Sequence, residues 1–126
     1  MEPTKNFVID GRKITSLESF YEFVGSEFFD GKIPENLDAF EEILGDLVEE
    51  EGAITVRWAD ASLSRDVLGY PETLRALVEQ MKHAHPDNIE TIKEKISSAE
   101  AGQGETLFDT LEEIFLNTEQ VTLILE

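Results

Sequence analysis

Apolar residues recur at helical spacing in five stretches of the chain. In each stretch they return every three or four residues, so they line one face of a helix whose other face is polar. In chain order, the five apolar stripes are Leu17, Phe20, Tyr21, Val24 and Phe28; Leu37, Phe40, Leu44, Leu47 and Val48; Leu74, Leu77, Val78 and Met81; Ile89, Ile92 and Ile96; and Leu107, Phe108, Leu111, Ile114 and Phe115. The pattern therefore predicts about five helices, the fourth with a narrow apolar face that packs at the periphery.

Three shorter stretches have the pattern of strands. Residues 7–9 form an apolar run closed by an Asp-Gly turn, which is typical of a buried strand. Residues 53–58 alternate between apolar and polar side chains, and residues 121–125 have the composition of a strand that is buried on both faces, as in the centre or second position of a parallel sheet. Helices between the first two strands favour a crossover connection. We therefore expect one α/β domain over residues 1–126, with a three-stranded parallel sheet flanked by helices.

Capping residues and breakers predict where the helices begin and end. The predicted N-terminal caps are a Thr15–Glu18 capping box, Asn36 following the breaker Pro34, and an Asp87–Glu90 capping box. Residues 97–104 are small and polar and are predicted to form a loop. Residues 59–66 have an irregular pattern, and no helix is predicted there.

The helix that begins at Asn36 carries acidic residues on a face that the core does not need. Asp38 and Glu42 lie four residues apart, and Asp46 continues the row. Like charges at this spacing destabilise an isolated helix by a few tenths of a kcal/mol per pair, so the row does not serve helix stability. Two interpretations stay open. The row is either a partner-binding face or an ordinary solvated face in a chain with 28 acidic residues.

The net charge of −18 narrows the classes of partner. Such a charge repels phosphate backbones and anionic lipid, so direct binding to nucleic acid or to a membrane surface is not expected, whereas a basic protein is attracted. Improved solubility and adaptation to high salt are alternative explanations of the acidity. The chain has no cysteine and begins without the pattern of a signal peptide, which indicates a cytoplasmic protein.

Other candidate chemistry is weakly supported. His83 and His85 lie near a helix end, but residues two apart on a helix point in different directions, so a metal site is disfavoured. Ser62 and Ser64 could pair with these histidines as nucleophile and base, yet no nucleophile elbow or glycine-rich loop accompanies them. Carboxylates on a helix do not match a calcium loop. We expect no metal, no cofactor and no catalytic residues.

Three blocks of sequence point to one family. Ile9-Asp10-Gly11 leads to Ile14 and Ser16, residues 35–40 read Glu-Asn-Leu-Asp-Ala-Phe, and the last helix runs into a C-terminal strand. Over residues 6–60 and 104–126 these blocks resemble the barstar family of intracellular bacterial ribonuclease inhibitors. The resemblance implies a three-stranded parallel sheet flanked by helices. It also implies that the second helix and its preceding loop plug the active site of a small, basic, secreted ribonuclease.

The resemblance also implies the partner-binding residues. Asp38 matches the first acidic contact of the family and Glu42 matches the second. Glu113 matches a peripheral acidic contact on the last helix. Asn36 would both cap the helix and contact the partner. The carboxylates would stand in for substrate phosphate and pair with the cationic groups of the ribonuclease active site. The full predicted set is Ile33, Asn36, Asp38, Glu41, Glu42, Gly45, Asp46 and Glu113.

This chain departs from the family pattern around the acidic residues. Pro34 stands where the family has a glycine, Lys32 and Ile33 replace loop tyrosines, and Glu41 and Leu47 replace aromatic residues. The acidic residues are kept while the aromatic ones around them are lost, and aromatic residues are common interface anchors. These departures therefore affect which partner we expect and not the fold that the resemblance implies.

Residues 64–104 are longer than the family core and are predicted to be a helical insertion. We expect a protein that is monomeric when free and that inhibits a basic ribonuclease or nuclease toxin as an immunity protein. The alternatives are a barstar-like protein that binds or regulates an unrelated basic partner, and, least favoured, a small enzyme.

Overall fold

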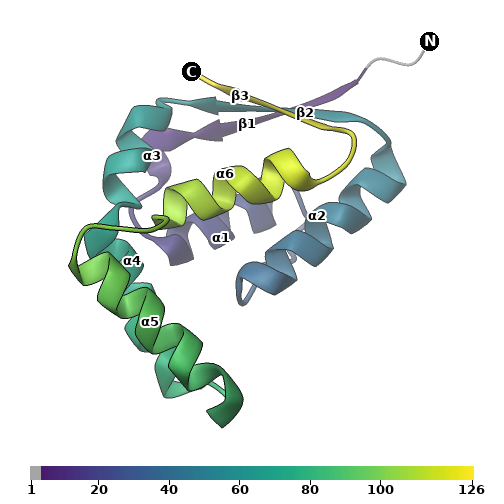
Figure 1. Cartoon of the computed structure of the whole chain (residues 1–126). Coiled ribbons are helices and arrows are strands. Elements are labelled where there is room, and N and C mark those ends of the chain that lie inside the picture. Colours follow the sequence, from purple (N-terminus) through teal and green to yellow (C-terminus); the bar gives the residue numbers. More distant parts are fainter. Residues whose placement is uncertain (1–3) are drawn as a thin grey trace.

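A computed structural model describes residues 4–126 and places a parallel three-stranded sheet above a layer of helices (Figure 1). Strand β1 spans Lys5–Asp10, β2 spans Ile54–Ala59 and β3 spans Val121–Leu125, in the order β1-β2-β3. The register pairs Ile9 with Trp58, and Trp58 with Leu125. The predicted α/β class and the parallel pairing are confirmed.

Within residues 4–126, six α-helices and two short 3-10 turns connect the strands. The α-helices are α1 (Leu17–Glu27), α2 (Leu37–Glu51), α3 (Ala61–Val67), α4 (Tyr70–Lys82), α5 (Ile89–Glu100) and α6 (Leu107–Asn117), and the 3-10 turns are Gly11–Lys13 and Pro86–Asn88. The five predicted helices are all present. Helix α3 was not predicted, because its inward positions are the small residues Ala61 and Ser64, which leave no apolar stripe to detect.

Two predictions about strand burial are wrong. β3 lies at an edge of the sheet, and the central strand is β2, whose Ile54, Val56 and Trp58 are fully buried. Val8 of β1 is 53% exposed. In Figure 1, helices α1, α2 and α6 lie on the same side of the sheet, so apolar residues on the opposite side of the edge strands stay accessible within the described part of the chain.

Two predicted capping boxes are also wrong. Helix α1 is capped by Ser16, whose Oγ accepts from the Ser19 backbone N–H at 3.1 Å while Ser19 Oγ accepts from the Ser16 N–H at 2.9 Å. Before α5, residues 86–88 form a 3-10 turn, so Asp87 lies outside the helix. The predicted loop 97–104 is shorter than expected because α5 continues to Glu100.

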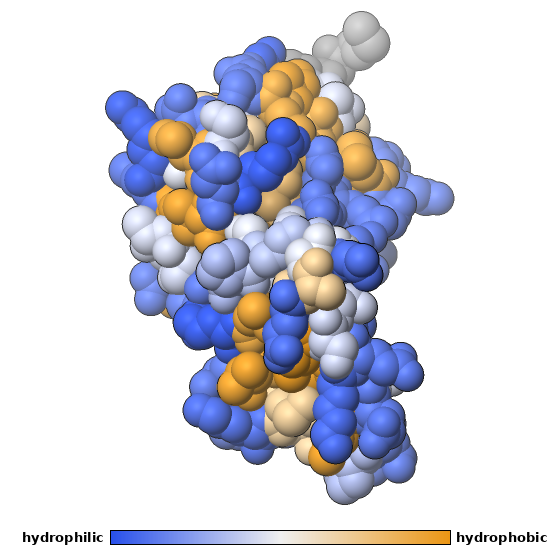
Figure 2. All heavy atoms as spheres, turned by 60° about the vertical axis from the view of Figure 1, so that its left-hand side comes forward, coloured by the Kyte–Doolittle hydropathy of each residue, from blue (hydrophilic) through white to orange (hydrophobic). Residues whose placement is uncertain are grey.

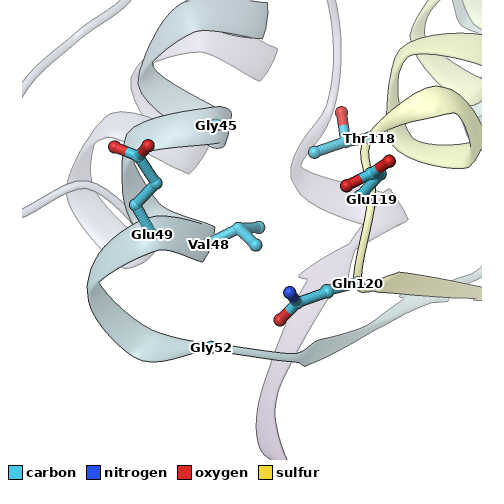
Figure 3. Close-up of a pocket in the computed structure, with 7 residues that line it drawn as sticks. All are labelled: Gly45, Val48, Glu49, Gly52, Thr118, Glu119 and Gln120. Carbon is cyan, nitrogen blue, oxygen red and sulfur yellow. The ribbon is translucent and has the colours of Figure 1, made fainter.

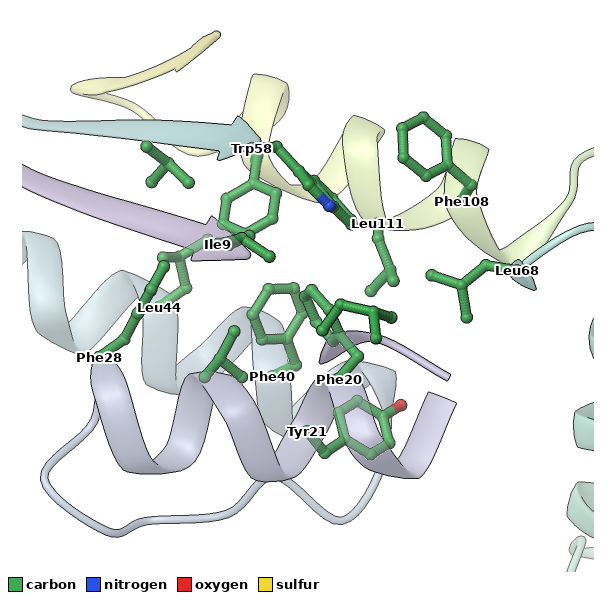
Figure 4. Packing of buried hydrophobic residues seen from close by; sticks show 14 of the residues in the cluster. Ile9, Phe20, Tyr21, Phe28, Phe40, Leu44, Trp58, Leu68, Phe108 and Leu111 are labelled. Atoms are coloured by element: carbon green, nitrogen blue, oxygen red, sulfur yellow. The ribbon is translucent and has the colours of Figure 1, made fainter. Parts of the chain in front are cut away.

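The core lies between the sheet and the helix layer, and aromatic rings fill much of it (Figure 4). Trp58 is 0% exposed and has ring centroids of Phe20 at 5.6 Å and Phe108 at 4.9 Å. Its Nε1–H donates to Ser64 Oγ at 2.9 Å, and the Ser64 hydroxyl donates to the Gly11 carbonyl at 3.4 Å. Ser64 is therefore a buried structural residue, which disfavours the nucleophile interpretation.

Helices α4 and α5 pair as a hairpin that projects from the body (Figure 1). Figure 2 shows apolar side chains gathered on this lower part of the molecule, and Val78 of α4 is 47% exposed. The base of the hairpin supports two other helices. Glu72 Oε2 accepts from the Leu17 N–H at the start of α1, and Thr73 Oγ1 accepts from the Leu107 N–H at the start of α6, both at 2.9 Å.

Candidate functional site

The loop between α1 and α2 is held closely against α1. A Cβ at Gly25 would meet Ile33 Cα at 2.9 Å, so glycine permits the close approach. The Gly31 N–H donates to the Gly25 carbonyl at 2.7 Å, and Gly31 adopts a φ of +90° that glycine accommodates without strain. Pro34 is buried while Ile33 is 54% exposed. The loop thus presents Ile33 at the surface and fixes where α2 begins.

Asn36 caps α2 as the sequence predicts. Its backbone is extended, with φ of −159°, and its Oδ1 accepts from the Ala39 N–H at 2.7 Å. This bond satisfies one of the free N–H groups of the first turn. Asp38 follows in that turn, where the positive end of the helix dipole favours a carboxylate. The cap therefore sets the direction in which the first acidic side chain leaves the helix.

The predicted separation of an apolar and an acidic face of α2 is confirmed. Phe40, Leu44 and Leu47 are buried against the sheet and neighbouring helices. On the other side, the acidic face consists of the exposed residues Asp38, Glu41, Glu42 and Asp46, with Gly45 half-buried among them. Together with Ile33 and Asn36, the structure thus brings seven of the eight predicted site residues onto the loop and α2.

Within residues 4–126, the four carboxylates of the acidic face form no ion pair with a basic side chain. Helix α2 contains no lysine or arginine, and it ends in Glu49, Glu50 and Glu51 at the negative end of its dipole. The repulsion between neighbouring carboxylates along α2, and the placement of glutamates at its C-terminal end, are unfavourable in the isolated protein. Binding a cationic partner would relieve them.

Tyr21 borders the beginning of the acidic face and was not predicted as a site residue. The ring belongs to the core, and burial raises the pKa of its hydroxyl well above the usual range, with further contributions from the negative charges of Glu18 and Asp38. Sequence periodicity places Tyr21 in the core and carries no signal of its proximity to α2.

Glu113 lies on α6 among other acidic residues. A hydrogen bond with the Glu105 carboxyl raises the pKa of Glu113, and repulsion from Glu105, Asp109 and Glu112 raises it further. Glu113 is thus part of an acidic group on α6 and the loop before it, on a different element from the other seven predicted residues.

A hollow of about 450 Å³ lies where the C-terminal half of α2 meets the turn between α6 and β3 (Figure 3). Gly45, Val48, Glu49 and Gly52 line it from α2, and residues 118–120 line it from the turn. Of these residues only Gly45 was predicted to belong to the site. The sequence holds no local signal for the others, because their proximity depends on how α6 and β3 pack beside α2.

A second groove of about 280 Å³ lies on the other side of α2, against β1 and the end of α1. Phe7, Asp46 and Glu51 are among the residues that line it. Lys5 lies in this groove and pairs with its lining residues: its Nζ lies 3.2 Å from Glu51 Oε1 and 5.5 Å from the centre of the Phe7 ring. One cation of the chain itself is therefore paired at this groove.

The histidines have ordinary neighbours. His83 Nε2 lies 3.7 Å from Glu79 Oε1, and His85 Nδ1 accepts from the Asp87 N–H at 3.2 Å. Across residues 4–126, no three histidine, cysteine, aspartate or glutamate side chains come together as a metal-binding group. None of the helices described is long and apolar enough to span a bilayer.

Comparison with protein-family models matches residues 4–123 of this chain to the family described as barstar (barnase inhibitor). The match covers nearly the whole chain, including the loop, α2 and the α6–β3 turn. None of the curated proteins compared with the chain matches it.

Proposed function

Because the chain belongs to the barstar (barnase inhibitor) family, we propose that it inhibits a basic ribonuclease by covering the active site with the α1–α2 loop and the acidic face of α2. Members of this family are inhibitors and not enzymes. The observation that carries the proposal is the capped helix α2, whose acidic face of Asp38, Glu41, Glu42 and Asp46 forms no ion pair with a basic side chain within residues 4–126.

The chemistry of the two surfaces is complementary. A ribonuclease active site collects cationic side chains around the phosphate of its substrate, and carboxylates can occupy the same positions through charge-assisted hydrogen bonds. Asp38 and Glu42 are one helical turn apart on the acidic face, so they can enter such a site together. Asp46, Glu41 and the exposed Ile33 would form the rim of the contact, and Glu113 a peripheral one.

The fold reduces the entropic cost of binding. Phe40 and Leu44 are fully buried, and the Asn36 cap fixes the first turn, so α2 is ordered before a partner arrives. The net charge of −18 would also attract a basic partner over a distance and speed association at low ionic strength.

An inhibition assay tests this proposal. The protein and an Asp38→Ala/Glu42→Ala variant are titrated into a panel of small basic bacterial ribonucleases while RNA cleavage is followed. We expect stoichiometric inhibition by the native protein. The variant should bind roughly a hundredfold or more weakly, because it leaves buried cations of the ribonuclease unpaired.

A matched control separates specific contacts from the loss of net charge. Glu90→Ala/Glu94→Ala removes two exposed carboxylates with the same spacing from α5. We expect this control to inhibit like the native protein. Equal loss of inhibition in the two double variants would show that only the overall charge matters and would refute the proposed face.

The partner need not be a ribonuclease of the usual kind. The acidic face carries Glu41 and Gly45 at exposed or half-buried positions and no aromatic residue, so it offers charge rather than aromatic anchors. A nuclease toxin or another basic protein that the chain neutralises or regulates in the cytoplasm would also fit. If no ribonuclease in the panel is inhibited, binding to such a partner becomes the favoured function. That residues 64–104 are an insertion in the family fold stays a prediction.

A further inference from the structure

The hollow beside Gly45 interrupts the acidic face at its C-terminal end. Figure 3 shows Val48 and Gln120 extending toward each other from opposite sides of the hollow, with Glu49 on the α2 side and Glu119 on the turn. The hollow is open to solvent and continuous with the face proposed to meet the ribonuclease, because Gly45 belongs to both.

Gly45 is not required by the packing of the protein. A Cβ at this position would meet no atom within 4 Å, and Gly45 lies in the interior of α2, where glycine is less favourable than alanine. The φ of Gly45 is not positive, so backbone conformation does not require glycine either. The consequence of glycine at position 45 is that no side chain fills the hollow.

The charges around the hollow favour a cation. Glu49 and Glu119 both line it, and within residues 4–126 neither forms an ion pair. The last turn of α2 contains no basic residue, so the negative end of its dipole adds to the same field. By contrast, the groove on the other side of α2 already contains Lys5 paired with Glu51.

We propose that this hollow receives an arginine side chain of the inhibited protein, in addition to the cations that meet Asp38 and Glu42. The inference rests on the proposed function for the identity of the partner. The guanidinium would pair with Glu49 and Glu119, and the Gln120 side-chain carbonyl would accept a further hydrogen bond. The aliphatic part of the arginine would lie along Val48 and the open surface at Gly45.

The shape of the site favours arginine over lysine. The possible acceptors lie on two elements, α2 and the α6–β3 turn, so they are spread around the hollow. A planar guanidinium offers five N–H donors in a fixed fork and can bond to both sides, whereas an ammonium is a compact and strongly hydrated charge. Arginine residues also contribute disproportionately to the stability of protein interfaces. The hollow would therefore select partners that carry an arginine beside the active site.

A small probe tests the hollow without any ribonuclease. N-acetyl-arginine amide is titrated into the full-length, ¹⁵N-labelled protein, with the neutral isostere N-acetyl-citrulline amide and N-acetyl-lysine amide as comparisons. We expect the arginine probe to shift the amide signals of Gly45, Gly52, Glu119 and Gln120 first. We expect Gly45→Leu and Glu119→Gln to weaken this binding about fivefold or more.

The same titration can overturn the inference. Equal binding of the citrulline or lysine probe would contradict the assignment to arginine. Shifts spread evenly over all acidic surfaces would show nonspecific attraction only. Because Gly45→Leu removes a helical glycine, its native fold is checked by its amide spectrum, and Glu119→Gln provides an independent test at the other side of the hollow.

A second experiment places the hollow in the complex. Binding of any ribonuclease that the native protein inhibits is measured with Glu119→Gln, and with Glu94→Gln on α5 as the matched control. We expect about tenfold weaker binding for Glu119→Gln and no change for the control. Inhibition unaffected by Glu119→Gln would overturn this inference while leaving the proposed function intact. If no ribonuclease is inhibited, the proposed function fails and the probe titration still decides whether the hollow binds arginine.

Discussion

Replacement of Asn36 by alanine tests how strongly the cap holds α2. The substitution removes the hydrogen bond from the Ala39 N–H to Asn36 Oδ1, which is 2.7 Å long and exposed to solvent. Water can reach the freed N–H, so the loss is that of an ordinary N-cap, about 1 kcal/mol in the free energy of unfolding. For 126 residues the entropy of unfolding near the melting temperature is about 0.26 kcal/mol/K, so Tm should fall by about 4 °C.

Urea unfolding followed by the fluorescence of Trp58 measures this change. Trp58 is the single tryptophan of the chain and is fully buried, so its emission reports the loss of the core. Asn36→Ser, which restores a capping oxygen, should recover most of the lost stability. Asn88→Ala is the matched control, because Asn88 occupies the N-cap position of α5 but makes no side-chain capping bond.

The cap is also expected to matter for inhibition. Fraying of the first turn would move Asp38, so Asn36→Ala should weaken inhibition while Asn36→Ser restores it. If Asn36→Ala and Asn88→Ala change the free energy of unfolding equally, or if Asn36→Ser fails to recover stability, the assignment of a stabilising cap at Asn36 is refuted.

Two further predictions concern buried polar contacts. Glu72 has a side chain that is 12% exposed, and its pKa is lowered mainly by its hydrogen bond with Arg75. The ionised Glu72 side chain therefore contributes about 1 kcal/mol to the free energy of unfolding above the ordinary carboxyl pKa of 4.5, and this contribution is lost as the pH falls through the lower pKa of the folded state. The difference in stability between the native protein and Glu72→Gln should accordingly shrink from neutral pH to about pH 3. A difference that stays constant with pH in urea titrations would contradict the lowered pKa of Glu72. Ser64→Ala removes the acceptor of the buried Trp58 Nε1–H and should cost about 1–3 kcal/mol, whereas the exposed neighbour Ser62→Ala should cost almost nothing in the same assay.

The parts of the fold that follow from local patterns were predicted from the sequence. Apolar spacing identified five helices and three strands, and Asn36 was recognised as a cap because its chemistry acts within three residues. The acidic face of α2 was also predicted, since exposure on a helix follows from the position of its apolar stripe. Helix α3 was not predicted, because the residues that it buries are small and have the composition of a loop.

The remaining errors come from long-range packing. The apolar composition of residues 121–125 is compatible with a central strand, and only the assembled sheet shows that β2 holds that place. The start of α1 was misassigned because Thr15 and Ser16 are adjacent and both suit an N-cap, and the local sequence does not choose between them. The hollow beside Gly45 is lined by residues 45–52 and 118–120, which are more than sixty positions apart in the chain, so no local motif could have indicated it.

The hydrogen bonds at the base of the α4–α5 hairpin have a practical consequence for engineering. Glu72 and Thr73 accept hydrogen bonds from the first N–H groups of α1 and α6. Excising the whole hairpin would therefore leave one backbone N–H at the start of each helix without its acceptor. The tip, at residues 83–88, takes no part in these bonds and projects from the body (Figure 1). Exposed loop tips tolerate insertions best. A fluorophore, an affinity tag or a fused protein should therefore be attached at the tip, where it would leave both helix starts intact.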